Sequence, residues 1–160
     1  MKQYFVVTFI PLVIFSFVLF SCGASSSPSS ATLEEARQAI AASKAIYFQA
    51  FEKGDSSIFI DRYADDCCIM APDGPALCGP IAPLEFFRVA YYGLGLRNGK
   101  FTTTAVYGDG EEYVTEEGLW ESFGANGAKF DNGKFLVLWK KTPKGWKMYR
   151  DSFSSNNKQE

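Results

Sequence analysis

Among the residue types that most often act in catalysis or metal binding, this chain has carboxylates and cysteines but lacks histidine. Its 160 residues include no histidine, which is the commonest general base near neutral pH and the commonest metal ligand. We therefore expect no metal site and no cofactor. Asp65 and Asp66 are paired carboxylates that could do acid–base work or hold a cation. The alternative, which we prefer, is that they end a helix in a solvated turn.

Three cysteines flank a Pro-Asp-Gly-Pro sequence that has the composition of a tight turn. A turn at Asp73-Gly74 would bring Cys78 near Cys67 and Cys68, so we expect one disulfide and one remaining thiol. A one-residue change of register decides whether Cys67 or Cys68 pairs with Cys78. Because adjacent strand residues point to opposite faces, a metal site made of all three cysteines is not expected.

The paired aspartates and the three cysteines all lie in the stretch from Ala45 to Gly79, whose local structure must position them. Gly54 suits the position just past a helix end, and Asp55 is a strong N-cap for a following helix. That second helix would carry Ile58, Phe59 and Tyr63 on its apolar face. A short strand, Cys67 to Ala71, would then fold back as a hairpin.

The remaining elements follow from local signals. Thr32 and Glu35 form a capping box, which predicts that the first helix begins there. Another helix is expected over Ile81 to Leu94. From Lys100 onward the composition changes to Thr, Val, Tyr, Phe and Trp with glycine punctuation. This pattern predicts four antiparallel strands, near 100–108, 112–123, 134–142 and 146–153.

The order of these motifs resembles the SnoaL-like, ketosteroid-isomerase-like branch of the nuclear transport factor 2-like superfamily. The similar pieces are Gly54-Asp55, Tyr63-Ala64-Asp65-Asp66, the Pro72–Pro75 turn, and the strands 133–139 and 145–151. The resemblance covers most of residues 33–153. It implies an α+β, cone-shaped roll of the cystatin-like type, in which N-terminal helices pack on a curved, mainly antiparallel sheet. A pocket is implied between helices and sheet.

The predicted register decides which side chains share a face of the sheet. Turns centred on 128–129 and 143–144 place Trp120 opposite Val137 and Val137 opposite Arg150. One face then holds Trp120, Phe135, Val137, Trp139, Met148 and Arg150, and the other holds Leu119, Leu136, Leu138, Tyr149 and Asp151. The resemblance implies that the first set faces the pocket. The second set is also apolar, which predicts a homodimer through that face.

The predicted pocket lining combines this face with the helices: Tyr47, Phe51, Tyr63, Trp120, Val137, Trp139, Met148 and Arg150. Arg150 could hold a carboxylate or enolate, or it could form a salt bridge with Asp61 or Asp65. Tyr47 matches the oxyanion-hole tyrosine of ketosteroid isomerase, but that enzyme's base and acid positions fall on Ala71 and Val137. The resemblance therefore implies that this chain is not a ketosteroid isomerase, and no catalytic residue is assigned.

The N-terminus has the features of a bacterial lipoprotein signal. Lys2 precedes an apolar run from Tyr4 to Phe20, and Leu-Phe-Ser-Cys ends at Cys22. We expect cleavage after residue 21 and lipidation of Cys22; the alternative is an uncleaved membrane anchor. Gly23 after the cysteine favours the outer membrane facing the periplasm. The predicted organisation is a signal peptide (1–21), a flexible tether (22–31), the α+β domain (32–154) and a polar tail (155–160).

The charge composition bears on whether nucleic acid or a membrane is an expected binding partner. Lys2 is the only charge of the signal peptide, so the rest of the chain has 15 basic and 18 acidic side chains, a net charge of −3. Without a basic patch, nucleic acid is not an expected partner, and the only expected membrane contact is the lipid on Cys22.

Three functions remain open. The first and preferred function is a lipid-anchored domain that binds a small apolar, carbonyl-bearing or carboxylate-bearing molecule. The second is a SnoaL-like isomerase, cyclase or dehydratase. The third is a protein-interaction module whose pocket is only core.

Overall fold

The computed structural model describes residues 28–157, so the predicted signal peptide and the lipidation site at Cys22 lie outside the described residues. No helix within this range is both long enough and apolar enough to cross a membrane. The elements in chain order are α1 (Pro28–Tyr47), α2 (Gln49–Lys53), α3 (Ser56–Ile60), β1 (Tyr63–Met70), β2 (Leu77–Cys78), α4 (Ala82–Arg88), the π-helical turn η1 (Val89–Gly93), β3 (Asn98–Tyr107), β4 (Tyr113–Phe123), β5 (Lys129–Thr142) and β6 (Gly145–Ser155).

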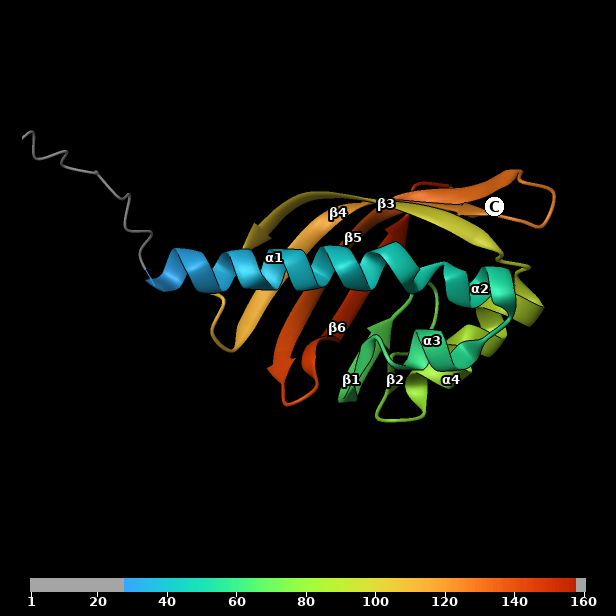
Figure 1. Ribbon diagram of the computed structural model, residues 1–160. Helices are drawn as coiled ribbons and strands as arrows, with labels where there is room; N and C mark the ends of the chain where they lie inside the picture. Colours follow the sequence, from blue (N-terminus) through green and yellow to red (C-terminus); the bar gives the residue numbers. More distant parts are fainter. Residues whose placement is uncertain (1–27, 158–160) are drawn as a thin grey trace, which may run out of the picture.

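The six strands form one sheet in the order β2-β1-β6-β5-β4-β3. Neighbouring strands are antiparallel except β1 and β6, which are parallel. Figure 1 shows α1 running across the curved sheet, while α2, α3 and α4 gather at the end of the domain reached by the C-terminal end of α1. The expected α+β roll, with N-terminal helices on a curved and mainly antiparallel sheet, is confirmed.

The predicted helix junction at Gly54-Asp55 is confirmed, but the helix before it is not continuous: α1 ends at Tyr47 and α2 begins at Gln49. Gly54 adopts a left-handed conformation with φ of 65°, which glycine enters without steric strain. Asp55 then caps α3, because its carboxylate accepts a hydrogen bond from the backbone N–H of Ser57 at 2.9 Å. Local interactions therefore end α2 and start α3 at this point of the chain.

Two predicted helix boundaries are wrong. The first helix begins at Pro28 rather than at a cap on Thr32, and the Thr32 hydroxyl instead donates to the carbonyl oxygen of Asp109 at 2.6 Å. The short helix α3 ends at Ile60, so Tyr63 is the first residue of β1 rather than part of a helical face. In both cases a distant strand or turn determines the side chain's role.

An aromatic core joins the helices. Phe51 of α2, Phe59 of α3 and Phe87 of α4 are almost completely buried. Ring centroids lie 4.9 Å apart for Phe51 and Phe87 and 5.3 Å apart for Phe51 and Phe59. Such pairs contribute about 0.5–1.5 kcal/mol beyond simple burial. This core fixes α2, α3 and α4 against one another.

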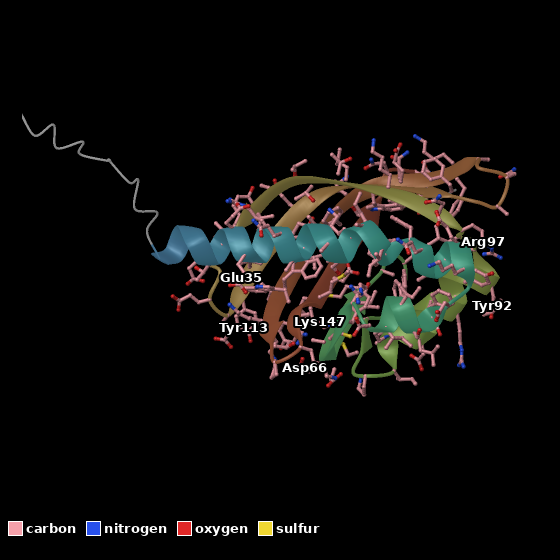
Figure 2. All side chains as sticks on the ribbon, viewed as in Figure 1. Glu35, Asp66, Tyr92, Arg97, Tyr113 and Lys147 are labelled. Carbon is pink, nitrogen blue, oxygen red and sulfur yellow. A yellow bond between two sulfur atoms is a disulfide. The ribbon has the colours of Figure 1, made fainter. Side chains whose placement is uncertain are left out.

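The outward face of the sheet is more polar than expected. Leu119 and Leu136 are 50% and 51% exposed there, but the same face carries Asp66, whose carboxylate pairs with Lys140 at 2.8 Å. Figure 2 shows Asp66 at the part of the sheet away from α1. The homodimer through this face stays a prediction.

Candidate ligand-binding site

A cavity of about 400 Å³ lies between the concave face of the sheet, α1 and the α4–η1 segment. Five predicted pocket residues line it: Tyr47, Trp120, Val137, Trp139 and Met148. Phe51 does not, because it lies within the aromatic core. A surface hollow of about 470 Å³ between α1, α2 and β3 is lined by Gln49, Glu52 and Lys100 among others. No buried carboxylate lines that hollow, so we place the candidate site in the cavity.

The predicted position of Arg150 in the pocket is wrong, because the register of β5 and β6 shifts between Leu138 and Trp139. Trp139 pairs with Met148 as predicted, but Leu138 pairs with Arg150. The extra residue on β6 is a β-bulge, which changes the face to which the following side chains point. Arg150 therefore lies on the outward face.

The contacts of Arg150 on that face also differ from the salt bridge considered as its alternative. Its guanidinium lies 3.7 Å from the ring centroid of Tyr149. It donates hydrogen bonds to the carbonyl oxygen of Asp66 at 3.1 Å and to the Tyr149 hydroxyl at 3.0 Å. Its bonds thus go to Asp66 and Tyr149 rather than to the carboxylates of Asp61 or Asp65.

The same bulge turns Asp151 into the cavity. Asp151 pairs with Val137 across the sheet, is buried and lines the cavity. The hydroxyl of Tyr63 donates to Oδ2 of Asp151 at 2.7 Å, whereas within residues 28–157 Oδ1 has no hydrogen-bond partner. Burial raises the pKa of Asp151 to about 6; the bond from Tyr63 lowers it, and the charge of Glu116 raises it. A buried carboxyl perturbed in this way is typical of functional sites.

Two tyrosines accompany Asp151. Burial raises the pKa of Tyr47 and of Tyr63, and the negative charge of Asp151 raises both further. Both phenols are therefore neutral and able to donate. Tyr47 lines the cavity and interacts with the hydroxyl of Tyr63. Tyr63 does not line the cavity, but it interacts with two residues that do, Asp151 and Tyr47.

The predicted pairing of Trp120 with Val137 is wrong, because β4 and β5 pair four residues away from that register and Trp120 lies opposite Gly133. The residue opposite Val137 on β4 is a second buried carboxylate, Glu116. Its Oε1 accepts hydrogen bonds at 2.6 Å from Lys44 Nζ and from the Thr103 hydroxyl, and its Oε2 accepts one from the indole N–H of Trp139 at 3.1 Å. Glu116 is thus fully engaged, in contrast to Asp151.

The hairpin of β1 and β2 forms part of the cavity wall. Cys68 and Cys78 are opposite partners in this hairpin and form a disulfide, with Cα atoms 4.1 Å apart. Of the two pairings left open, Cys68 with Cys78 is the one formed, and Cys67 is a buried free thiol. The loop between the strands contributes Ala71 and Pro72 to the lining. The disulfide therefore holds the ends of a lining loop together.

The cavity opens near η1. Val89 and Leu94 line it and are 58% and 66% exposed. Phe130 also lines the cavity and is 41% exposed. Tyr92, exposed beside them, lies at the α2 end of the domain in Figure 2. An apolar molecule would meet apolar side chains before it reached the buried carboxylates.

Asp65 and Asp66 do not end a helix, and the expectation of a helical turn is wrong. Both belong to β1. Asp66 bonds to Lys140 on the outward face, and this bond lowers the pKa of its carboxyl. Neither residue lines the cavity. Within residues 28–157 no group of three or more His, Cys, Asp or Glu side chains could hold a metal ion.

Sequence reasoning missed four charged residues of the cavity: Lys44, Glu116, Asp131 and Asp151. Lys44 had a usable signal, because it follows Ile40 by four residues and precedes Tyr47 by three, which places it on the buried stripe of α1. Asp151 had none, because the bulge that reverses its face is not visible in the composition of either strand.

No protein-family model matches this chain, and no curated protein matches it. Solved structures do. A nuclear transport factor 2-like protein of unknown function from Shewanella oneidensis is 17% identical, covers 74% of this chain and 98% of its own, and has a TM-score of 0.62. A ketosteroid isomerase-like protein from Erwinia carotovora is 21% identical over 76% of this chain and 96% of its own, with a TM-score of 0.60.

A domain of unknown function with a cystatin-like fold, from Nostoc punctiforme, is 14% identical. It covers 76% of this chain and 78% of its own, with a TM-score of 0.65. At these identities the likeness concerns the fold. The chain therefore has the cystatin-like α+β fold of the nuclear transport factor 2-like and ketosteroid isomerase-like proteins.

Proposed function

We propose that this domain binds a small, mainly apolar molecule in its cavity. The observation that supports the proposal is a cavity of about 400 Å³ with an aromatic and aliphatic lining and a few fixed polar groups, which is the composition of small-molecule sites in general. The expected preference for a carbonyl or carboxylate depended on Arg150. Arg150 lies outside the cavity, and Lys44 is already bonded to Glu116, so we do not retain that preference.

Native mass spectrometry of the full chain tests this proposal. We expect a copurifying small molecule in the wild type that is lost in Val137→Phe, because Val137 is buried in the cavity wall and a larger ring there fills the space. Leu138→Phe is the matched control, since the neighbouring side chain points to the outward face. Equal ligand content in both variants would contradict binding in this cavity.

A second candidate function is proton transfer. It is favoured by Asp151, whose pKa is raised to about 6 by burial and whose carboxylate is held by Tyr63, because a general base works best when its pKa is near the working pH. Asp151 does not occupy the base position of ketosteroid isomerase. Deuterium exchange into a bound ketone, abolished by Asp151→Asn, would support an isomerase, cyclase or dehydratase. Unchanged exchange in the variant would exclude Asp151 as the base.

We also propose that the domain is tethered to the bacterial outer membrane, facing the periplasm, through lipid on Cys22. The supporting observation is the Leu-Phe-Ser-Cys sequence at the end of the apolar run. In the variant Cys22→Ala, fatty-acid labelling should disappear and the precursor should accumulate at its full length. Labelling that persists in this variant would refute the lipid anchor.

A further inference from the structure

Four charged side chains line the cavity: Lys44, Glu116, Asp131 and Asp151. Asp131 is half-buried, and its Oδ1 accepts hydrogen bonds from the Ser155 hydroxyl and from the backbone N–H of Asn132, both at 2.7 Å. Lys44 and Glu116 neutralise one another at 2.6 Å. Asp151 has no cationic partner among the described residues, and its one side-chain hydrogen bond comes from the neutral Tyr63. When all three carboxylates are ionised, the lining therefore has an excess of two negative charges, and the buried carboxylate with a free oxygen is Asp151.

Aromatic side chains line the same cavity as the Asp151 carboxylate and favour a positively charged ligand group. Phe153 follows Asp151 by two residues on the same face of β6 and lines the cavity together with Phe86, whose ring meets it edge-on at 5.8 Å. Elsewhere in the cavity the rings of Phe101 and Phe135 already surround the ammonium of Lys44 at 5.1 and 5.0 Å. Aromatic faces attract ammonium groups through their quadrupole, so carboxylate and rings favour the same kind of ligand.

We infer that the cavity takes an apolar molecule carrying a single protonated amine, whose ammonium group bonds to Oδ1 of Asp151. This inference rests on the proposed binding function and specifies the ligand's charge. The apolar body would extend past Phe153 towards Trp120, whose ring lies 5.8 Å from that of Phe153.

Other ligand charges fit the same geometry less well. A carboxylate would meet the negative charges of Glu116, Asp131 and Asp151. Lys44, the one cation among the described lining residues, is engaged by Glu116. A neutral alcohol could bond to Oδ1, but it would leave the charge of Asp151 uncompensated, and an uncompensated buried charge is strongly unfavourable. An ammonium supplies both the hydrogen bond and the missing charge.

The affinity for an amine should depend on pH through Asp151. The titratable groups that interact with it are Tyr63 and Cys67 on β1, Tyr47 on α1 and Glu116 on β4. Lys44 of α1 and Asp131 of β5 line the same cavity. Burial raises the pKa of both phenols and raises that of the Cys67 thiol to about 11, so all three stay neutral. Because Asp151 titrates near pH 6, amine affinity should fall about tenfold from pH 7.5 to pH 5.

The test compares three probes of nearly the same shape: 4-phenylbutylamine, 4-phenylbutanol and 4-phenylbutyrate. The full chain, reconstituted in phosphatidylcholine nanodiscs, is titrated with each probe by calorimetry at pH 7.5, and empty nanodiscs supply the background. We expect the amine to bind ten- to a hundredfold more tightly than the alcohol, as one charge-assisted hydrogen bond requires. The acid should bind most weakly of the three.

Asp151→Asn should abolish the preference for the amine and leave the affinity for the alcohol unchanged. Asparagine can still accept the hydrogen bond from Tyr63, and melting curves check that the variant is folded. Asp65→Asn removes the same charge from an exposed position on β1 and should keep the preference. Acid binding as tight as amine binding, or an amine preference that survives Asp151→Asn, would overturn this inference alone. Failure of all three probes to bind would overturn the binding function with it.

Discussion

Glu116→Gln is expected to lower the free energy of unfolding by about 3–5 kcal/mol at pH 7, because removing one partner of a buried ion pair leaves the other as an uncompensated charge. The side chains of Glu116 and Lys44 are 1% and 11% exposed. Glutamine has one acceptor oxygen, so it can keep the bonds at the Oε1 position but loses the one from the Trp139 indole N–H. The measured loss therefore reports on that hydrogen bond and on the uncompensated charge of Lys44 together. Urea denaturation followed by circular dichroism measures the change.

Two further variants test whether the loss of stability comes from the buried ion pair. Glu121→Gln removes a carboxylate that pairs with Lys129 at 3.0 Å on the surface, where both side chains are well exposed. Such exposed pairs contribute about 0.2–1 kcal/mol. The double replacement Lys44→Met with Glu116→Leu removes both charges and should recover most of the lost stability. A loss in Glu116→Gln no larger than that in Glu121→Gln would contradict the importance of the buried pair.

Asp151→Asn is expected to raise the free energy of unfolding above pH 6, whereas Glu116→Gln lowers it. The pKa of Asp151 is raised by burial from 3.8 to about 6, so the native state disfavours the ionised form more than the unfolded state does. The contribution of Asp151 to stability is fully present below its unfolded pKa and is lost as pH rises through 6. That loss corresponds to about 3 kcal/mol at pH 8.

The measurement is the free energy of unfolding of both proteins at pH 4 and pH 8. The two should have similar stability at pH 4, where Asp151 is largely protonated, and the variant should be more stable at pH 8. Comparing variant with wild type removes the contribution of Asp61 and Asp66, whose pKa values are lowered and which change stability in the opposite direction. Equal destabilisation by Asp151→Asn at both pH values would show that something in the fold compensates the ionised carboxylate.

The contrast between these carboxylates indicates where the ligand binds. Glu116 and Asp151 both pair with Val137 and both line the cavity. Glu116 has a lysine, a threonine and a tryptophan as partners, whereas Asp151 has one tyrosine. A buried charge that weakens its own fold is typical of a site kept for function rather than for stability.

Much of this architecture is local and could be predicted from the sequence. Gly54 and Asp55 determine a helix end and a helix start through their own backbone and side-chain preferences. Alternating Thr, Val, Tyr, Phe and Trp residues predict the strands, and the ends of the observed β3 to β6 differ from the predicted ranges by at most five residues. Trp120, Val137, Trp139 and Met148 follow from that alternation, so the part of the apolar lining that the sheet contributes was partly predicted.

The charged part of the site depends on tertiary structure. Strand side chains alternate with a period of two, so one extra residue exchanges the faces of everything beyond it. The bulge between Leu138 and Trp139 does this: it places Arg150 outside and Asp151 inside, the reverse of the expectation from an unbroken register. No residue near the bulge signals it, because Arg150 and Asp151 are adjacent and equally polar. The partners of Asp151 and Glu116 come from β1 and α1, which only the folded chain brings to the same cavity.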